Sequence, residues 1–259
     1  MNNEYLNFAK QIAYEAGKIM LKYFKIDNGE SYKCDRTIVT LADKEINDYL
    51  IEKVKEKFPE HSVDGEEKSF GKSKYVWVCD PVDGTAMYAR HIPVAVFSLA
   101  LVIDGKPEVG VVYDPFLENL YYAEKGKGAY KNDTKISVND IELDDQKAIA
   151  NFEMWPTCEY NMWDTLKELG KKTYFINIGS IIRSCVSVAN AEFVASVFPG
   201  TKHKNCDIAA VKVIVEEAGG KVTDLFGNEQ RYDQDINGAV ISNGKVHEQI
   251  IETIKQYLK

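Results

Sequence analysis

The chain has 259 residues, of which 45% are hydrophobic and 28% are charged, the ordinary balance of a globular protein that buries a sizeable core. Its formal net charge of −8 argues against a nucleic-acid-binding protein, which would present a basic face. No apolar run approaches the roughly 18 residues that a membrane span needs. The five cysteines are scattered without CxxC spacing, which indicates reduced, mostly buried thiols and a cytoplasmic protein.

The first half of the chain is predicted to hold two helices and then an antiparallel meander. Apolar residues recur at helical spacing from Tyr5 to Tyr23, which indicates an amphipathic core helix and not a targeting signal. After a polar loop, Thr40 is predicted to cap a second helix, with Asp43 completing a capping box. Strands are predicted at about 75–80, 94–103, 108–113 and 119–123, with a hairpin turn at 104–106.

From about residue 140, predicted strands alternate with predicted helices. The strands are at 148–152, 174–178, 193–198 and 239–242, and the helices at 180–190, 207–218 and 246–258. We divide the chain into an N-terminal α+β half, 1–140, which holds the antiparallel sheet, and a C-terminal α/β half, 141–259, which completes the site. Since no Pro- or Ser-rich linker separates the halves, we expect one continuous interface of layered helices and sheets.

The most informative stretch is YVWVCDPVDGT at residues 75–85. An apolar run of strand character ends on Asp80, turns over a proline, places a second acid at Asp83 and closes with Gly84 and Thr85. Two carboxylates in this position are ligands of the kind that Mg²⁺ prefers. Backbone amides at Gly84 and Thr85 would face a phosphate held by such a cation. The stretch therefore predicts a site for metal-assisted phosphoryl transfer.

Further acids elsewhere in the chain complete this pattern, although each has an ordinary structural alternative. Glu66 follows a glycine in an acidic turn, and Asp207 opens an apolar helix. Taken singly, an acidic turn such as that at Glu66 is typical of solvated surface, and an Asp-Gly pair such as Asp83-Gly84 is typical of a turn. Asp207 alone could be a helix N-cap, and Asp43 alone could be only a capping acid. The functional interpretation depends on their combination.

Two thiols flank the proposed ligands. Cys79 precedes Asp80, and Cys206 precedes Asp207. Soft thiols are poor partners for Mg²⁺, so we expect both cysteines to be packing residues.

The motifs resemble those of the inositol monophosphatase family. The similar blocks are GEE at 65–67, WVCDPVDGT at 77–85, GKGAYKN at 126–132 and CDIAA with a later EAGG between 206 and 220. The resemblance covers essentially the whole chain. It implies a lithium-sensitive, Mg²⁺-dependent phosphatase with an α/β fold, the five-layered αβαβα sandwich of the sugar phosphatases, and usually a homodimer. It also implies direct attack by water, without a covalent phosphoenzyme.

The resemblance implies a metal site for two or three Mg²⁺ ions. Glu66, Asp80 and the Val82 carbonyl would hold the first ion. Asp80, Asp83 and Asp207 would hold the second.

The resemblance also implies catalytic and substrate-binding roles. Thr85, hydrogen-bonded to Asp43, would orient and deprotonate the attacking water beside Glu66. The substrate side would be formed by Gly84, Thr85, Gly179, Ser180 and Lys204.

Several positions depart from the family pattern. Residues 86–88 are Ala-Met-Tyr where Thr-Asn-Phe is frequent, and Cys206 replaces a usual tryptophan. Gly200 lies where animal inositol monophosphatases carry an acid that contacts inositol hydroxyls. Lys204 lies where some archaeal dual fructose-bisphosphatase/inositol phosphatases carry arginine. The motifs of the catalytic core are therefore complete, whereas those of the substrate pocket are not.

We favour hydrolysis of a small phosphorylated metabolite, a polyol or sugar phosphate with inositol-1-phosphate first. Alternatives within the superfamily are fructose-1,6-bisphosphatase, histidinol-phosphatase and nucleotide phosphatases acting on PAP or NADP. A haloacid dehalogenase-type phosphatase needs Asp-x-Asp, but two residues separate Asp80 from Asp83. A non-enzymatic Mg²⁺-binding regulator would lack the water-activating set, yet Glu66, Asp43 and Thr85 are all present.

Overall fold

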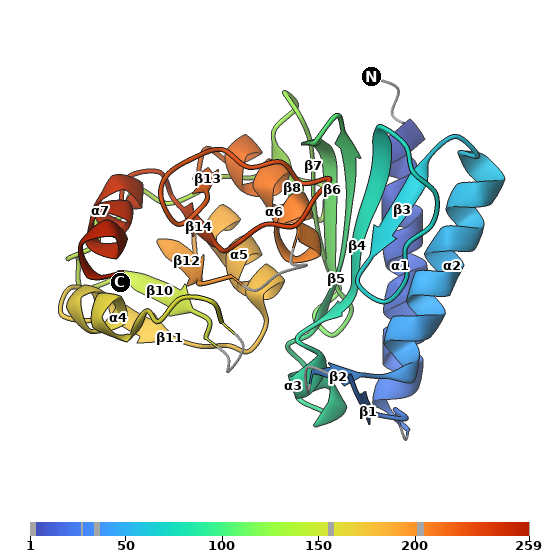
Figure 1. Cartoon of the computed structure of the whole chain (residues 1–259), viewed down its shortest axis with the longest axis horizontal. Coiled ribbons are helices and arrows are strands. Elements are labelled where there is room, and N and C mark those ends of the chain that lie inside the picture. Colours follow the sequence, from blue (N-terminus) through green and yellow to red (C-terminus); the bar gives the residue numbers. More distant parts are fainter. Residues whose placement is uncertain (1–3, 27, 34–36, 155–157, 201–204, 259) are drawn as a thin grey trace.

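The chain forms five layers of helices and sheets in the order αβαβα (Figure 1). The structure is a computed structural model that describes residues 4–26, 28–33, 37–154, 158–200 and 205–258. From one side to the other, the layers are α1 with α2, a seven-stranded sheet, α5 with α6, a five-stranded sheet, and α4 with α7. The predicted five-layered sandwich is confirmed.

The first layer consists of α1 (Glu4–Phe24) and α2 (Leu41–Lys57), as the apolar spacing of both segments predicts. Their buried faces pack with one face of the seven-stranded sheet in a single apolar cluster, which includes Phe8, Leu50 and Trp77. The N-terminus of α2 has the predicted capping box, since the Asp43 side chain accepts a hydrogen bond from the Thr40 backbone amide at 2.7 Å.

The seven-stranded sheet is the predicted meander extended at both edges. Only its first pair, β3 with β4, is parallel, and each later pair is antiparallel. Asp104 and Gly105 form the predicted hairpin turn, both at positive φ. In spatial order the strands are β3 (Ser62–Gly65), β4 (Tyr75–Asp83), β5 (Val96–Ile103), β6 (Lys106–Asp114), β7 (Asn119–Glu124), β8 (Ala129–Lys131) and β9 (Thr134–Ile136).

The five-stranded sheet is mixed. Its β10 pairs in parallel with both β11 and β12, whereas β14 runs antiparallel to β12 and β13. One face packs against α4 (Trp163–Leu169) and α7 (His247–Tyr257) in a separate apolar cluster. In spatial order the strands are β11 (Tyr174–Ile176), β10 (Ile149–Phe152), β12 (Ala195–Phe198), β14 (Ala239–Ser242) and β13 (Lys221–Thr223).

The central layer holds α5 (Ile181–Ala189) and α6 (Asn205–Glu217), which lie between the two sheets. Eleven consecutive α6 residues, from Asn205 to Val215, are buried, so this helix is apolar on nearly every side, as its sequence indicates. At Gly110 of β6 the backbones are so close that a Cβ would lie 2.4 Å from the Ala210 carbonyl oxygen. Glycine therefore sets the close approach of α6 to the seven-stranded sheet.

The predicted long elements are present, and the differences concern short ones. The predicted strands and helices did not include β3, β8, β9, β13 or α4, nor the small pair β1 (Ser31–Tyr32) with β2 (Ile38–Val39). The missed strands have two to four residues and α4 has seven, so each buries too few side chains to show a period in sequence. The sheets change between β9 and β10, and the division into halves at 140/141 stays a prediction. Among the described residues, no helix is long and apolar enough to cross a membrane.

Candidate metal centre

The site is built around the end of β4, where the strand leaves its regular pairing. The register of β4 against β5 shifts between Asp80 and Asp83, so the strand bulges where both acids project. Gly84 then turns the chain into α3 (Thr85–Ala89) with φ of 85°, a left-handed conformation that favours glycine. A Cβ at Gly84 would lie 3.1 Å from the carbonyl oxygen of Gly179. The turn therefore packs directly against the loop that precedes α5.

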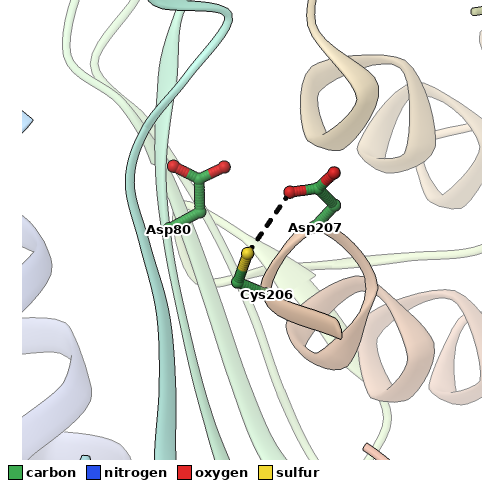
Figure 2. A group of neighbouring side chains, drawn as sticks. All are labelled: Asp80, Cys206 and Asp207. Atoms are coloured by element: carbon green, nitrogen blue, oxygen red, sulfur yellow. Dashed lines mark hydrogen bonds between the residues drawn. The ribbon is translucent and has the colours of Figure 1, made fainter. Parts of the chain in front are cut away.

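Asp80 meets Asp207 across the central interface (Figure 2). Asp80 projects from β4, while Asp207 and Cys206 project from the first turn of α6. One donor atom from each of the three side chains lies within 4.8 Å of the others, and all three residues are buried. The predicted pairing of Asp80 with Asp207 is thus present in the structure. Since α6 begins at Asn205, Asp207 is its third residue and not its N-cap.

Cys206 packs in an apolar cluster, as predicted, and its thiol also lies beside the two carboxylates, which the prediction did not include. Its sulfur donates a hydrogen bond to Asp207 Oδ1 at 3.4 Å. The prediction considered the thiol only as a ligand for Mg²⁺. The helical position, one residue before Asp207 in the same turn, was the signal that could have placed this sulfur beside the carboxylates.

Asp83 is held by the start of α5. It accepts hydrogen bonds from the Ser180 hydroxyl and from the Ile182 amide, the latter at 2.9 Å. Burial raises the pKa of Asp83, and the nearby Asp207 carboxylate raises it further. Ser180 also caps α5 through a hydrogen bond from the Arg183 amide. The structure thus places Ser180 and Gly179 against the β4–α3 turn, and their contact with a substrate stays a prediction.

Glu66 follows β3, and its amide donates to the Cys79 carbonyl at 3.1 Å. Lys33 approaches the carboxylates of Glu66 and Glu67, with distances of 3.3 and 2.5 Å from its ammonium nitrogen. Burial lowers the pKa of Lys33, but the two carboxylates outweigh it and the net shift is upward. Sequence reasoning missed Lys33, which belongs to a polar loop without a recognisable motif.

Asp43 and Thr85 are arranged differently from the predicted pair. The Thr85 hydroxyl donates to the Val82 carbonyl at 2.8 Å, since the two residues face each other across the tight turn. Asp43 Oδ2 accepts from Thr40, while the fully buried Oδ1 has no hydrogen-bond partner among the described residues. The pKa of Asp43 is raised to about 7, mainly by burial. The hydrogen bonds from Thr40 lower this pKa, whereas the charge of Glu66 raises it. The predicted hydrogen bond between Thr85 and Asp43 is therefore absent from the described residues.

The residues present fit Mg²⁺. The cation prefers oxygen ligands, and Asp80, Asp83 and Asp207 supply buried carboxylates from both halves of the chain. Burial and, second, the charge of Asp207 raise the pKa of Asp83, and a bound cation would offset both effects. A cavity of about 250 Å³, lined in part by Glu66 and Cys206, lies beside them.

The predicted substrate pocket is only partly described. Lys204 lies outside the described residues. At Gly200, φ is 55° and a Cβ would lie 2.2 Å from the Gly238 amide nitrogen, so no side chain fits there. The position thus offers no acid to substrate hydroxyls, in keeping with its departure from the family pattern.

Together, the five-layered fold and the acidic centre define a metal-dependent phosphatase of the sugar phosphatase type. The chain matches the inositol monophosphatase family over residues 1–259 and belongs to this family. It is therefore a phosphoric monoester hydrolase, as predicted.

Curated relatives cover nearly the full chain. A protein of Thermotoga maritima named fructose-1,6-bisphosphatase/inositol-1-monophosphatase is 26% identical over 98% of this chain and 97% of its own. A protein of Neisseria meningitidis serogroup B named putative Nus factor SuhB is 31% identical over 99% of this chain and 100% of its own.

Solved structures agree with the fold. The structure of a Thermotoga maritima IMPase superposes with a TM-score of 0.88 at 26% identity, covering 98% of this chain and 97% of the other. A staphylococcal IMPase-I complexed with products also gives a TM-score of 0.88 at 26% identity, covering 99% and 97%.

We predict that Mg²⁺ stabilises the chain more at high pH than at low pH. The unfolded chain releases the Asp83 proton near pH 4, whereas the folded, metal-free chain keeps it until about pH 7. Stability of the metal-free chain therefore falls as pH rises between these values. Bound Mg²⁺ favours the ionised carboxylates and reverses this loss.

The measurement is urea denaturation at pH 5 and pH 8, each with Mg²⁺ and with a chelator. Mg²⁺ should raise the midpoint more at pH 8. The same increase at both pH values would contradict the assignment of these buried acids to a cation site.

Proposed function

We propose that this chain is a Mg²⁺-dependent phosphomonoesterase that hydrolyses small polyol or sugar phosphates, with inositol-1-phosphate as its main substrate. The observation that carries the proposal is that Asp80 and Asp207 converge from separate layers. Asp83, which accepts a hydrogen bond from the Ile182 amide, supplies a third carboxylate. The names of its relatives, which include fructose-1,6-bisphosphatase/inositol-1-monophosphatase, support this substrate class.

In this proposal, the chain holds two or three Mg²⁺ ions. Glu66, Asp80 and the Val82 carbonyl would hold one of them, and Asp80, Asp83 and Asp207 would hold a second. When bound, Mg²⁺ neutralises phosphate charge and makes water more acidic. Ser180 supports this arrangement by fixing the orientation of Asp83.

The water that attacks phosphorus is positioned by Thr85 and Glu66. We assign the Thr85 hydroxyl to accept a hydrogen bond from this water and to pass its own proton toward Asp43. Asp43 Oδ1 suits this role because it is a buried acceptor without a partner in the described structure. The Thr85 hydroxyl then exchanges its Val82 acceptor for Asp43, while the amides of Gly84 and Thr85 receive the phosphate.

Asp80→Asn tests the metal assignment. The substitution keeps the side-chain volume but weakens a ligand proposed to serve both ions. We expect kcat to fall by about 10²-fold or more while the fold is retained. Asp48→Asn is the matched control, because Asp48 is an exposed acid that pairs with Lys68 on the surface. Hydrolysis by Asp80→Asn at the wild-type rate, measured with inositol-1-phosphate, would refute the assignment.

Thr85→Ala tests the orientation of water. We expect Mg²⁺ affinity to change little and the rate at saturating Mg²⁺ to fall by about 10²–10⁴-fold, the usual range for general acid–base groups. Thr85→Ser keeps the hydroxyl and should recover most of this rate. Weaker Mg²⁺ binding without a slower saturated rate would give Thr85 a structural role only.

The substrate pocket is proposed to be permissive. A site that hydrogen-bonds a substrate hydroxyl discriminates strongly against substrates that lack it, but Gly200 offers no such group. Lys204 supplies a cationic donor suited to an anion. We therefore propose fructose-1,6-bisphosphate as a second substrate, with Lys204 meeting its distal phosphate.

The test compares inositol-1-phosphate and fructose-1,6-bisphosphate in wild type and Lys204→Ala. The variant should raise KM for the bisphosphate several-fold and leave KM for inositol-1-phosphate nearly unchanged. Lys171→Ala, at an exposed lysine paired with Glu168, is the control for loss of surface charge. Equal effects on both substrates, or none, would refute the role of Lys204. Histidinol phosphate, PAP and NADP in the same panel address the remaining superfamily alternatives.

We also propose that the protein is a cytoplasmic homodimer. The family resemblance supports both features. The four described cysteines, Cys79, Cys158, Cys185 and Cys206, form no disulfide with one another, which agrees with a reducing compartment.

A further inference from the structure

The cluster of Asp80, Cys206 and Asp207 contains a sulfur donor in addition to two carboxylates. The three side chains come from two elements, β4 and α6, and converge on one buried point (Figure 2). Their exposed fractions are only 2–3%. Cys206 also packs in the central apolar cluster, but its thiol faces Asp207. Mg²⁺ is a hard cation with little affinity for thiols, whereas thiophilic cations bind them well.

The spacing of these donors matches a tetrahedral Zn²⁺ site. With Zn–S near 2.3 Å and Zn–O near 2.1 Å, two ligands at the tetrahedral angle lie about 3.6 Å apart. The Cys206 sulfur lies 3.4 Å from Asp207 Oδ1. Asp80 contributes a third donor within 4.8 Å of both.

We propose that Asp80, Cys206 and Asp207 bind a thiophilic divalent cation such as Zn²⁺, with the Cys206 sulfur as a ligand. On binding, a metal–sulfur bond forms and the thiol proton passes to solvent. The fourth position is left for water or substrate oxygen, as in open zinc sites. Affinities of such sites rise from Mn²⁺ toward Cu²⁺ and Zn²⁺, so this set distinguishes transition metals from Mg²⁺.

The proposed site is accessible from a cavity. The cavity of about 250 Å³ is lined by Cys206 together with Glu66 and Glu67. Cys206 thus borders a cavity whose lining carries more acids than bases. Because Asp80 and Asp207 also belong to the proposed Mg²⁺ site, this inference rests in part on the proposed function, and the two cations compete for shared oxygens.

Cobalt spectroscopy tests this inference without measuring catalysis. The metal-free full chain is titrated with Co²⁺, a coloured substitute for Zn²⁺, and thiolate-to-cobalt charge transfer is followed in the near ultraviolet. We expect a band that saturates with added Co²⁺ and is abolished by Zn²⁺. Cys206→Ser should lack the band and bind Zn²⁺ about 10–100-fold more weakly, the range seen when a metal site loses a supporting group.

Two further thiols serve as controls. Cys158→Ser changes a partly exposed cysteine and should keep the band, and Cys79→Ser changes the buried thiol next to Asp80 and should also keep it. Circular dichroism checks the fold of each variant, and Cys206→Ala replaces Cys206→Ser if the latter does not fold. No band in wild type, or a band lost in Cys79→Ser but kept in Cys206→Ser, would overturn the inference.

The outcomes also separate this inference from the proposed function. A wild-type chain that hydrolyses phosphomonoesters with Mg²⁺ but gives no cobalt–thiolate band refutes only the thiophilic site. A chain that gives the band but shows no Mg²⁺-dependent hydrolysis refutes only the proposed function.

Discussion

The rest of the structure depends on the burial of several carboxylates at one interface between layers. Two negative charges in a medium of low polarity repel strongly, and each also loses its hydration. The structure brings Asp83 and Asp207 close enough for one to raise the pKa of the other. Such an arrangement is costly for a metal-free chain. It becomes favourable when cations neutralise the charge, which makes the fold and the site parts of the same thermodynamic system.

The two halves of the chain meet at this point through the acids themselves. Asp83 ends a strand of the first sheet and is bonded to the first turn of α5, while Gly84 packs against Gly179. Asp207 lies in α6, which contacts both sheets. Relative movement of the layers would therefore displace the ligands, so the close packing of α6 against Gly110 helps to keep the site in order.

Much of this could be predicted from the sequence. Local sequence signals indicate the capping box at Thr40, the hairpin at Asp104 and the apolar helix α6. The buried strand β4 ends in the acidic motif from which the metal site was predicted. Short elements such as β3 and α4 have no such period, because pairing and packing with distant segments decide them.

The partners of the acids were harder to predict than the acids. Lys33 reaches Glu66 and Glu67 across a long sequence separation, and nothing in its own loop indicates the contact. The hydroxyl of Thr85 bonds to Val82 because a tight turn brings them together, a detail that depends on backbone geometry. Cys206 was judged by its poor match to Mg²⁺, although its place on the helix set it beside Asp207.

The two carboxylate oxygens of Asp43 have different roles, and this difference has a consequence for the evolution of such chains. One oxygen holds the first turn of α2, while the other has no structural partner in the described residues. A descendant that had abandoned catalysis would still be selected to keep this acid for folding. The presence of Asp43 is therefore weak evidence of catalytic activity. Loss of site residues that have no structural role would be an earlier sign that a lineage had acquired another function.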